Sequence, residues 1–113
     1  MVRTSQIASV EDYINFKADV FRALGDPTRL KILLFLRAGK RCACEIVPHV
    51  GLAQPTVSRH LSVLTERGIL RSQKQGNRVL YSVTDRRIFN AINALESGFI
   101  SSLQGEVTSR MRR

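Results

Sequence analysis

The chain has 113 residues, with 18 lysines and arginines against nine aspartates and glutamates, and this formal net charge of +9 favours a polyanionic partner, most often nucleic acid. The length fits one domain with one core, and the 43% share of hydrophobic residues excludes a disordered or low-complexity chain. Apolar runs stay well short of the ~18 residues of a membrane span, and the first residues lack a signal-peptide core, so we expect a cytoplasmic protein without a membrane partner.

Two helices are predicted in the first third of the chain, after a loose N-terminal tail over residues 1–8. Ser9 is a good N-cap, and the apolar residues after it recur at helical spacing until Gly25, a good helix stop. Asp26 and Pro27 then begin a second helix at once, with Asp as its N-cap and Pro at its first position, and Gly39 ends it.

A helix-turn-helix is predicted next. Its first helix is expected to begin close to Cys44, because Pro48 is tolerated in a first turn but costs roughly 3 kcal/mol deeper in a helix. A turn over residues 51–53 separates it from a second helix, which begins at Gln54 and ends before Gly68. That second helix carries one apolar stripe, formed by Val57, Leu61 and Leu64.

Two strands and a last helix complete the prediction. Over residues 69–83 the apolar period shortens to about 2, which predicts a β-hairpin with a basic, polar tip around Gly76. The last helix is expected to begin at Thr84 or Asp85 and to carry one long apolar stripe, part of which we expect in a dimer interface. The stripe consists of Ile88, Ile92, Leu95, Phe99, Leu103 and Val107. The domain is expected to span residues 9–104, followed by a basic tail over residues 105–113.

Helix, turn, helix and hairpin in this order are typical of a winged helix-turn-helix, so the expected fold is mostly α with a small β-hairpin. In this motif the second helix enters the major groove of double-stranded DNA with its N-terminal residues at the base edges. On that helix the predicted DNA contacts lie opposite or beside the apolar stripe: Gln54, Pro55, Thr56, Ser58, Arg59 and Ser62. At the hairpin the predicted contacts to the neighbouring groove or backbone are Lys74, Gln75, Asn77 and Arg78.

Three segments closely resemble the ArsR/SmtB family. They are GDPTRLKIL at residues 25–33, CACEI at residues 42–46, and QPTVSRHL at residues 54–61, the last followed by GIL at residues 68–70. The resemblance covers roughly residues 12–100. It implies a bacterial or archaeal homodimeric winged-helix repressor, dimeric through its first and last helices, which leaves its operator when a metal or metalloid binds.

Cys42 and Cys44 are the only two cysteines, and they lie where arsenic sensors of the family carry a Cys-x-Cys-[Asp/Glu] pattern. Soft thiolates select thiophilic ions, so the resemblance implies arsenite or antimonite as the inducer held by these two residues, with no cofactor required. Residues i and i+2 lie about 200° apart on a regular helix, so both thiolates can hold one ion only if the backbone there departs from helix. Some arsenic sensors carry a third cysteine where this chain has Val47, which leaves the third ligand to solvent, a small thiol or the partner chain.

Other functions stay open on the sequence alone. The same thiols would also suit a sensor of redox state or of another soft metal, and an architectural DNA-binding protein would respond to no ligand. A zinc site on the last helix is not expected, because that helix contains no histidine. His49 is expected at the surface, and His60 in packing or at a phosphate. An enzyme is not predicted, since nucleophile-elbow, phosphate-loop and HExxH motifs are absent from the sequence.

Overall fold

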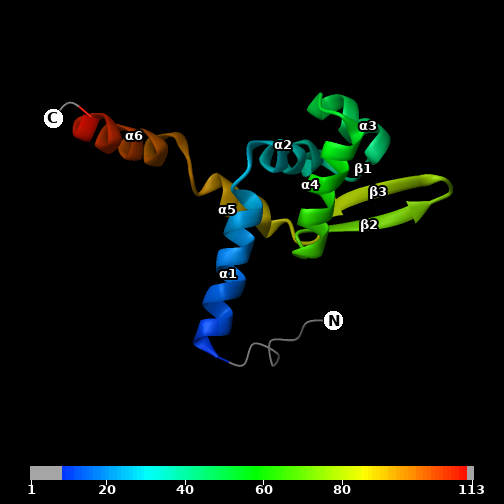
Figure 1. Ribbon diagram of the computed structural model, residues 1–113, viewed down its shortest axis with the longest axis horizontal. Helices are drawn as coiled ribbons and strands as arrows, with labels where there is room; N and C mark the ends of the chain where they lie inside the picture. The colour runs from blue at the N-terminus through cyan, green and yellow to red at the C-terminus, as the bar shows by residue number, and fades with distance from the viewer. Residues whose placement is uncertain (1–8, 112–113) are drawn as a thin grey trace.

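The computed structural model describes residues 9–111; the predicted tail over residues 1–8 lies outside the described residues. Figure 1 shows a helix-turn-helix beside a β-hairpin, with the first and last helices projecting away from them. None of the described helices is long and apolar enough to cross a membrane. In chain order the elements are α1 (Val10–Leu24), α2 (Pro27–Phe35), a 3-10 turn (Leu36–Ala38), β1 (Arg41–Cys42), α3 (Ala43–Val50), α4 (Gln54–Glu66), β2 (Leu70–Gln75), β3 (Arg78–Val83), α5 (Arg87–Asn93) and α6 (Ser97–Met111).

Local capping explains where the first helices begin. The Ser9 hydroxyl accepts a hydrogen bond from the Asp12 N–H at 3.1 Å, and the Asp26 carboxylate accepts one from the Arg29 N–H at 3.1 Å. Each bond satisfies one of the N–H groups that a helix start leaves without an internal partner. Gly51 ends α3 with φ of 77°, a left-handed conformation that any side chain would disfavour. The predicted starts of α1 and α2, and the turn after α3, are confirmed.

The hairpin of β2 and β3 forms the wing. Its register runs from Leu70 opposite Val83 to Gln75 opposite Arg78, so a two-residue turn with Gly76 at positive φ joins the strands. This hairpin confirms the predicted fold class, mostly α with a small β-hairpin.

A third strand, β1, was absent from the prediction. Its two residues pair antiparallel with β3, Cys42 opposite Leu80, and the strand order is β1-β3-β2. The wing is therefore hydrogen-bonded to the residue that immediately precedes α3.

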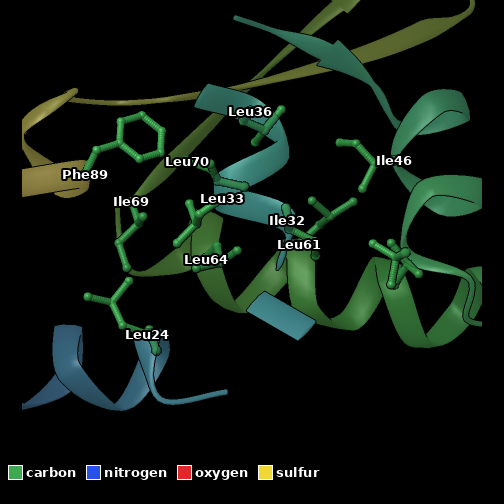
Figure 2. Packing of buried hydrophobic residues seen from close by; sticks show 13 residues of the cluster. Leu24, Ile32, Leu33, Leu36, Ile46, Leu61, Leu64, Ile69, Leu70 and Phe89 are labelled. Atoms are coloured by element: carbon green, nitrogen blue, oxygen red, sulfur yellow. The ribbon is translucent and has the colours of Figure 1, made fainter. Parts of the chain in front are cut away.

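One hydrophobic core joins the helix-turn-helix to the base of the wing (Figure 2). Each fully buried Val, Leu or Ile side chain of this core contributes about 1.5–3 kcal/mol to the stability of the fold, so the relative positions of α2, α3, α4 and β2 are tightly held. The largest fully buried side chains are Ile32, Leu33, Leu36, Ile46, Val57, Leu61, Leu64 and Leu70.

Two details of the helices differ from the prediction. α3 begins at Ala43, close to Cys44 as expected, but this start places Pro48 in the second turn of the helix rather than the first. The single last helix is two helices, α5 and α6. The reason for the break is Glu96, whose carboxylate accepts hydrogen bonds from the N–H groups of Gly98 and Phe99 at 3.0 and 2.5 Å and so starts a new helix.

Both projecting helices carry apolar side chains that the described chain leaves uncovered. α6 buries none of its residues, and in α1 only Ala23 and Leu24 are buried. The exposed large apolar side chains on the two helices are Val10, Tyr13, Ile14, Phe16 and Phe21 on α1, and Phe99, Ile100, Leu103, Val107 and Met111 on α6. Exposed apolar surface on this scale is typical of an interaction surface rather than of a solvated helix.

Candidate nucleic-acid interface and thiol site

α4 presents a polar face to solvent. Its apolar stripe of Val57, Leu61 and Leu64 is buried, which turns the opposite face outward. Of the six residues predicted to contact DNA on this helix, five are exposed and Thr56 is half-buried. The N-cap is Ala53, which makes no side-chain capping bond, so the N–H groups of Gln54 and Thr56 are left to a phosphate oxygen, while Pro55 between them carries none.

The wing presents its polar tip beside this helix. All four predicted contacts of the wing are exposed, as a surface that contacts a nucleic acid requires: Lys74, Gln75, Asn77 and Arg78. Arg71, on β2, is exposed as well. It was not among the contacts predicted from the sequence.

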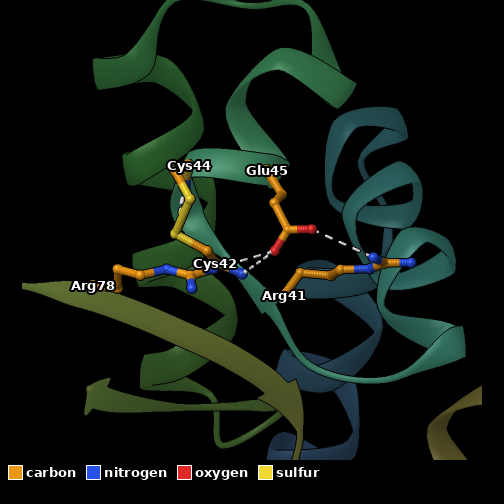
Figure 3. Close-up of a disulfide and its surroundings, with 5 residues drawn as sticks. All are labelled: Arg41, Cys42, Cys44, Glu45 and Arg78. Carbon is orange, nitrogen blue, oxygen red and sulfur yellow. Dashed lines mark hydrogen bonds and ion pairs between the residues drawn. A yellow bond between two sulfur atoms is a disulfide. The ribbon is translucent and has the colours of Figure 1, made fainter. Parts of the chain in front are cut away.

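The two cysteines meet at the start of α3. Cys42 has extended backbone, with φ −69° and ψ 147°, and is the N-cap of the helix, so the predicted departure from helical geometry is present. The Cα atoms lie 5.0 Å apart and the sulfur atoms are joined in a disulfide (Figure 3). Cys44 donates its N–H to the Cys42 sulfur at 3.0 Å.

The two sulfurs differ in access to solvent. Cys42 is only 3% exposed, beneath the wing, whereas Cys44 lies at the surface. A reagent or ion arriving from solvent therefore meets Cys44 first.

Glu45 connects the thiol site to its surroundings and was missed by the sequence reasoning, although the acidic position is part of the family pattern. Its carboxylate accepts the Cys42 N–H at 3.0 Å, and it lies 3.4 Å from Arg41 Nη1 and 3.8 Å from Arg78 Nη2 (Figure 3). The backbone hydrogen bond from Cys42 lowers the pKa of Glu45; partial desolvation opposes it, and the charges of Arg41 and Arg78 add to it. The carboxylate is thus a fixed negative charge between α3, β1 and the wing.

A pocket of about 430 Å³ joins the thiol site to the predicted DNA contacts. We call it the thiol pocket. Four predicted contacts, two from α4 and two from the wing, share its wall with both cysteines. Its lining consists of Cys42, Ala43, Cys44, Val47, Pro48, Gln54, Ser58, Asn77, Arg78 and Val79.

The histidines lie elsewhere. His49 is exposed and stacks on Phe35 with ring centroids 3.8 Å apart. His60 is half-buried on α4, with Nδ1 3.1 Å from Arg29 Nη1 and 3.7 Å from Asp26 Oδ2. It therefore packs α4 against the start of α2. Within residues 9–111 no group of three or more histidine, cysteine or acidic residues is arranged to hold a metal ion.

Residues 26–72 match the family described as bacterial regulatory protein, arsR family. The chain is 45% identical over 75 residues to a probable mercury resistance operon repressor of Streptomyces lividans, an alignment covering 66% of this chain and 60% of that protein. It is 39% identical over 80 residues to the uncharacterized HTH-type transcriptional regulator MJ1325 of Methanocaldococcus jannaschii, covering 70% and 90%. It is 36% identical over 64 residues to an arsenical resistance operon repressor of Staphylococcus xylosus, covering 57% and 62%.

Solved structures share the fold. The crystal structure of Rv0081 of Mycobacterium tuberculosis matches with a TM-score of 0.72 and 27% identity, covering 84% of this chain and 96% of that one. A homodimeric winged helix-turn-helix DNA-binding domain of Mycobacterium bovis, Mb0332, matches with a TM-score of 0.75 and 23% identity, covering 88% and 95%.

Proposed function

Because the chain belongs to the ArsR family, whose relatives here are DNA-binding transcriptional regulators rather than enzymes, we propose that it is a repressor that leaves its operator when a thiophilic metalloid, arsenite or antimonite, binds Cys42 and Cys44. The observation that carries this proposal is the thiol pocket, whose wall holds both cysteines together with residues of α4 and the wing. Operator binding of this kind would take place in the cytoplasm.

The DNA half of the proposal uses the exposed face of α4 and the wing. Arg59 suits guanine and Gln54 suits adenine, each through two hydrogen bonds in the major groove. The uncapped start of α4 and the hydroxyl of Ser58 suit phosphate oxygens. The other proposed contacts are Pro55, Thr56 and Ser62 on α4, and Lys74, Gln75, Asn77 and Arg78 on the wing.

The working unit is proposed to be a homodimer. The uncovered apolar faces of α1 and α6 would pack against a second copy, as the homodimeric state of the structural neighbour Mb0332 supports. A two-fold dimer would present two copies of α4 to successive major grooves, about 34 Å apart.

Release of the repressor from DNA would result from a change that the bound ion causes at the N-terminus of α3. The donor set fits a soft ion, because the two sulfurs already meet and Cys44 is open to solvent. An ion bound between the thiolates would draw the Cys42 sulfur away from the Cys44 N–H that it accepts at 3.0 Å. The disturbed helix start shares the thiol pocket with Gln54 and Arg78, so the change would reach both DNA-contacting elements.

The test is fluorescence anisotropy of a labelled duplex from upstream of the gene, at fixed salt and with a phosphine reductant. We expect tight binding that arsenite abolishes, and Cys44→Ser should bind the duplex equally well but ignore arsenite. Ala43→Ser is the matched control: it adds a hydroxyl between the cysteines, keeps both thiols and should respond as the wild type does. Tight binding that ignores arsenite but is abolished by mercuric ion would reassign the inducer to another soft metal.

A redox sensor is the second candidate, and the disulfide between Cys42 and Cys44 favours it. In this case oxidation of the two thiols, without any metalloid, would change operator affinity. Titration with a thiol oxidant in metal-free buffer distinguishes the two candidates. Binding that ignores oxidants and soft ions alike would instead indicate a ligand-independent architectural DNA-binding protein.

A further inference from the structure

Trivalent arsenic or antimony can bind three thiolates. Cys42 and Cys44 supply two of them, so one ligand is missing. The sequence holds only two cysteines, and Val47 lies in the wall of the thiol pocket. The carboxylate of Glu45, next to the cysteine pair in the chain, accepts the Cys42 N–H and pairs with Arg41 and Arg78 (Figure 3). The third ligand must therefore come from outside the protomer's described residues.

The thiol pocket is an open hollow large enough to hold a small molecule. Its volume of about 430 Å³ falls within the range of ligand pockets, and it opens beside the exposed Cys44. Val47, Pro48 and Val79 supply apolar wall, while Gln54 and Asn77 supply amide groups. The one charged residue in the lining is Arg78, and the nearby carboxylate of Glu45 pairs with it from outside the lining, so a carboxylate is the group that the wall itself can bind by charge.

Arg78 is available to such an occupant. Its side chain is 53% exposed, and it forms an ion pair with Glu45 at 3.8 Å (Nη2 to Oε1), a distance at which no hydrogen bond uses its N–H groups. A guanidinium can donate two parallel hydrogen bonds to one carboxylate. Figure 3 shows the Arg78 side chain extending from the wing toward the cysteine pair.

From this arrangement we infer that the third metalloid ligand is the thiolate of a low-molecular-weight thiol that carries a carboxylate, held in the thiol pocket with its carboxylate on Arg78. The inference rests on the proposed function. It makes the inducer a ternary complex of protein, metalloid and small thiol. Because the bound thiol would share the pocket with Gln54, Ser58 and Asn77, it would occupy space that the DNA contacts need.

The chemistry balances without electron transfer. Arsenous acid, As(OH)₃, exchanges its three hydroxyl groups for three thiolates, and the three thiol protons leave with the hydroxyls as three water molecules. Two thiols are Cys42 and Cys44, and the third is the small molecule. The disulfide must first be reduced: a phosphine takes up the oxygen of one water molecule and becomes its oxide, and the disulfide gains two hydrogens.

The experiment compares small thiols at equal concentration on the full chain, reduced by a phosphine. The probes are 3-mercaptopropionate, which carries a carboxylate, and cysteamine, which carries an ammonium group. Arsenite binding is followed without DNA, by arsenic–sulfur absorbance and by the mass of the intact complex. We expect 3-mercaptopropionate to lower the arsenite concentration needed for half-saturation about tenfold relative to cysteamine, and to appear in the complex.

Arg78→Gln should remove this preference for the carboxylate thiol. Arg71→Gln is the matched control, because it removes one positive charge from the same wing outside the thiol pocket and should keep the preference. Equal arsenite binding with both thiols, or with neither present, would overturn the inference and leave the proposed function intact. No arsenite binding to the reduced protein with any thiol would overturn the proposed function itself.

Discussion

Cys42 has two roles that a pair of substitutions separates. Its sulfur accepts the Cys44 N–H at 3.0 Å and so caps α3, and the same sulfur is one of the two proposed metalloid ligands. Serine keeps a side-chain acceptor at the N-cap but has no thiolate, whereas alanine removes both. We therefore expect Cys42→Ser to keep the fold and lose the metalloid response, and Cys42→Ala to lose stability as well.

The magnitude follows from the burial of the cap. Replacing a good N-cap side chain by alanine costs ~0.5–2 kcal/mol of unfolding free energy. Cys42 is only 3% exposed, so water cannot replace the lost hydrogen bond and the cost should not fall at the low end. We expect Cys42→Ala to be about 1 kcal/mol less stable than Cys42→Ser, which for a domain of this size is roughly 4 °C in melting temperature.

The assay is urea unfolding of both variants and the wild type in a phosphine reductant, so that no disulfide contributes. Operator binding is then measured with and without arsenite on the same samples. If the alanine and serine variants unfold at the same urea concentration, the capping role is refuted. If arsenite still releases Cys42→Ser from DNA, the assignment of the thiolate as a ligand is refuted.

Three further predictions concern the interface, the pH dependence of stability and the dimer. Arg59→Ala should weaken operator binding by ~1–3 kcal/mol in an anisotropy titration; an equal loss in the α6 control Arg110→Ala would remove Arg59 from the interface. Hydrogen bonds from Arg87 lower the pKa of Asp85 from 3.8 to about 2. Because the folded state holds this carboxylate ionised, its contribution to the free energy of unfolding is present above pH 3.8 and lost as the pH falls toward 2. Asp85→Asn should flatten that part of the curve in urea titrations, and an unchanged slope would contradict the pairing. Leu103→Glu should shift sedimentation toward monomer while Glu106→Gln should not, and two unchanged profiles would exclude α6 from the dimer.

Local signals explain which parts of the fold the sequence predicted. Ser9, Asp26 and Gly51 act on N–H groups or dihedral angles within a few residues, so their effect is visible in the sequence itself. The change of apolar period after α4 is equally local, and it predicted the wing. The apolar spacing of the last stripe, however, continues past Leu95 and conceals the competing cap of Glu96.

β1 was missed for a different reason. Its two residues make a strand only because β3 lies beside them, and Cys42 and its partner Leu80 are far apart in the chain. A two-residue segment has no period of its own, so propensity cannot identify it. Pairings of this kind belong to the tertiary structure.

For the candidate site too, the sequence predicted the local features and missed those that depend on tertiary contacts. Residue types and their order named the cysteines, the exposed face of α4 and the wing tip, but gave no sign that the cysteine pair would share a pocket with Gln54 and Arg78. Glu45 could have been found, because an acidic residue three positions after an N-cap is the signature of a capping box. The ion pair of Glu45 with Arg78 could not have been predicted, since it depends on where β3 places the wing.

The unequal burial of the two cysteines predicts the order in which they bind an ion. Cys42 is fixed by the β1–β3 pairing and by the cap of α3, so it can move only if the start of the helix moves. Cys44 is exposed and can capture an ion without disturbing the core. Capture at Cys44 therefore costs little structure, whereas closing the chelate through Cys42 must act on the helix start and the strand that carries the wing. A bare ion held by Cys44 alone, too small to reach the DNA contacts of the pocket, should bind without releasing DNA, and an ion that engages both sulfurs should move the helix start.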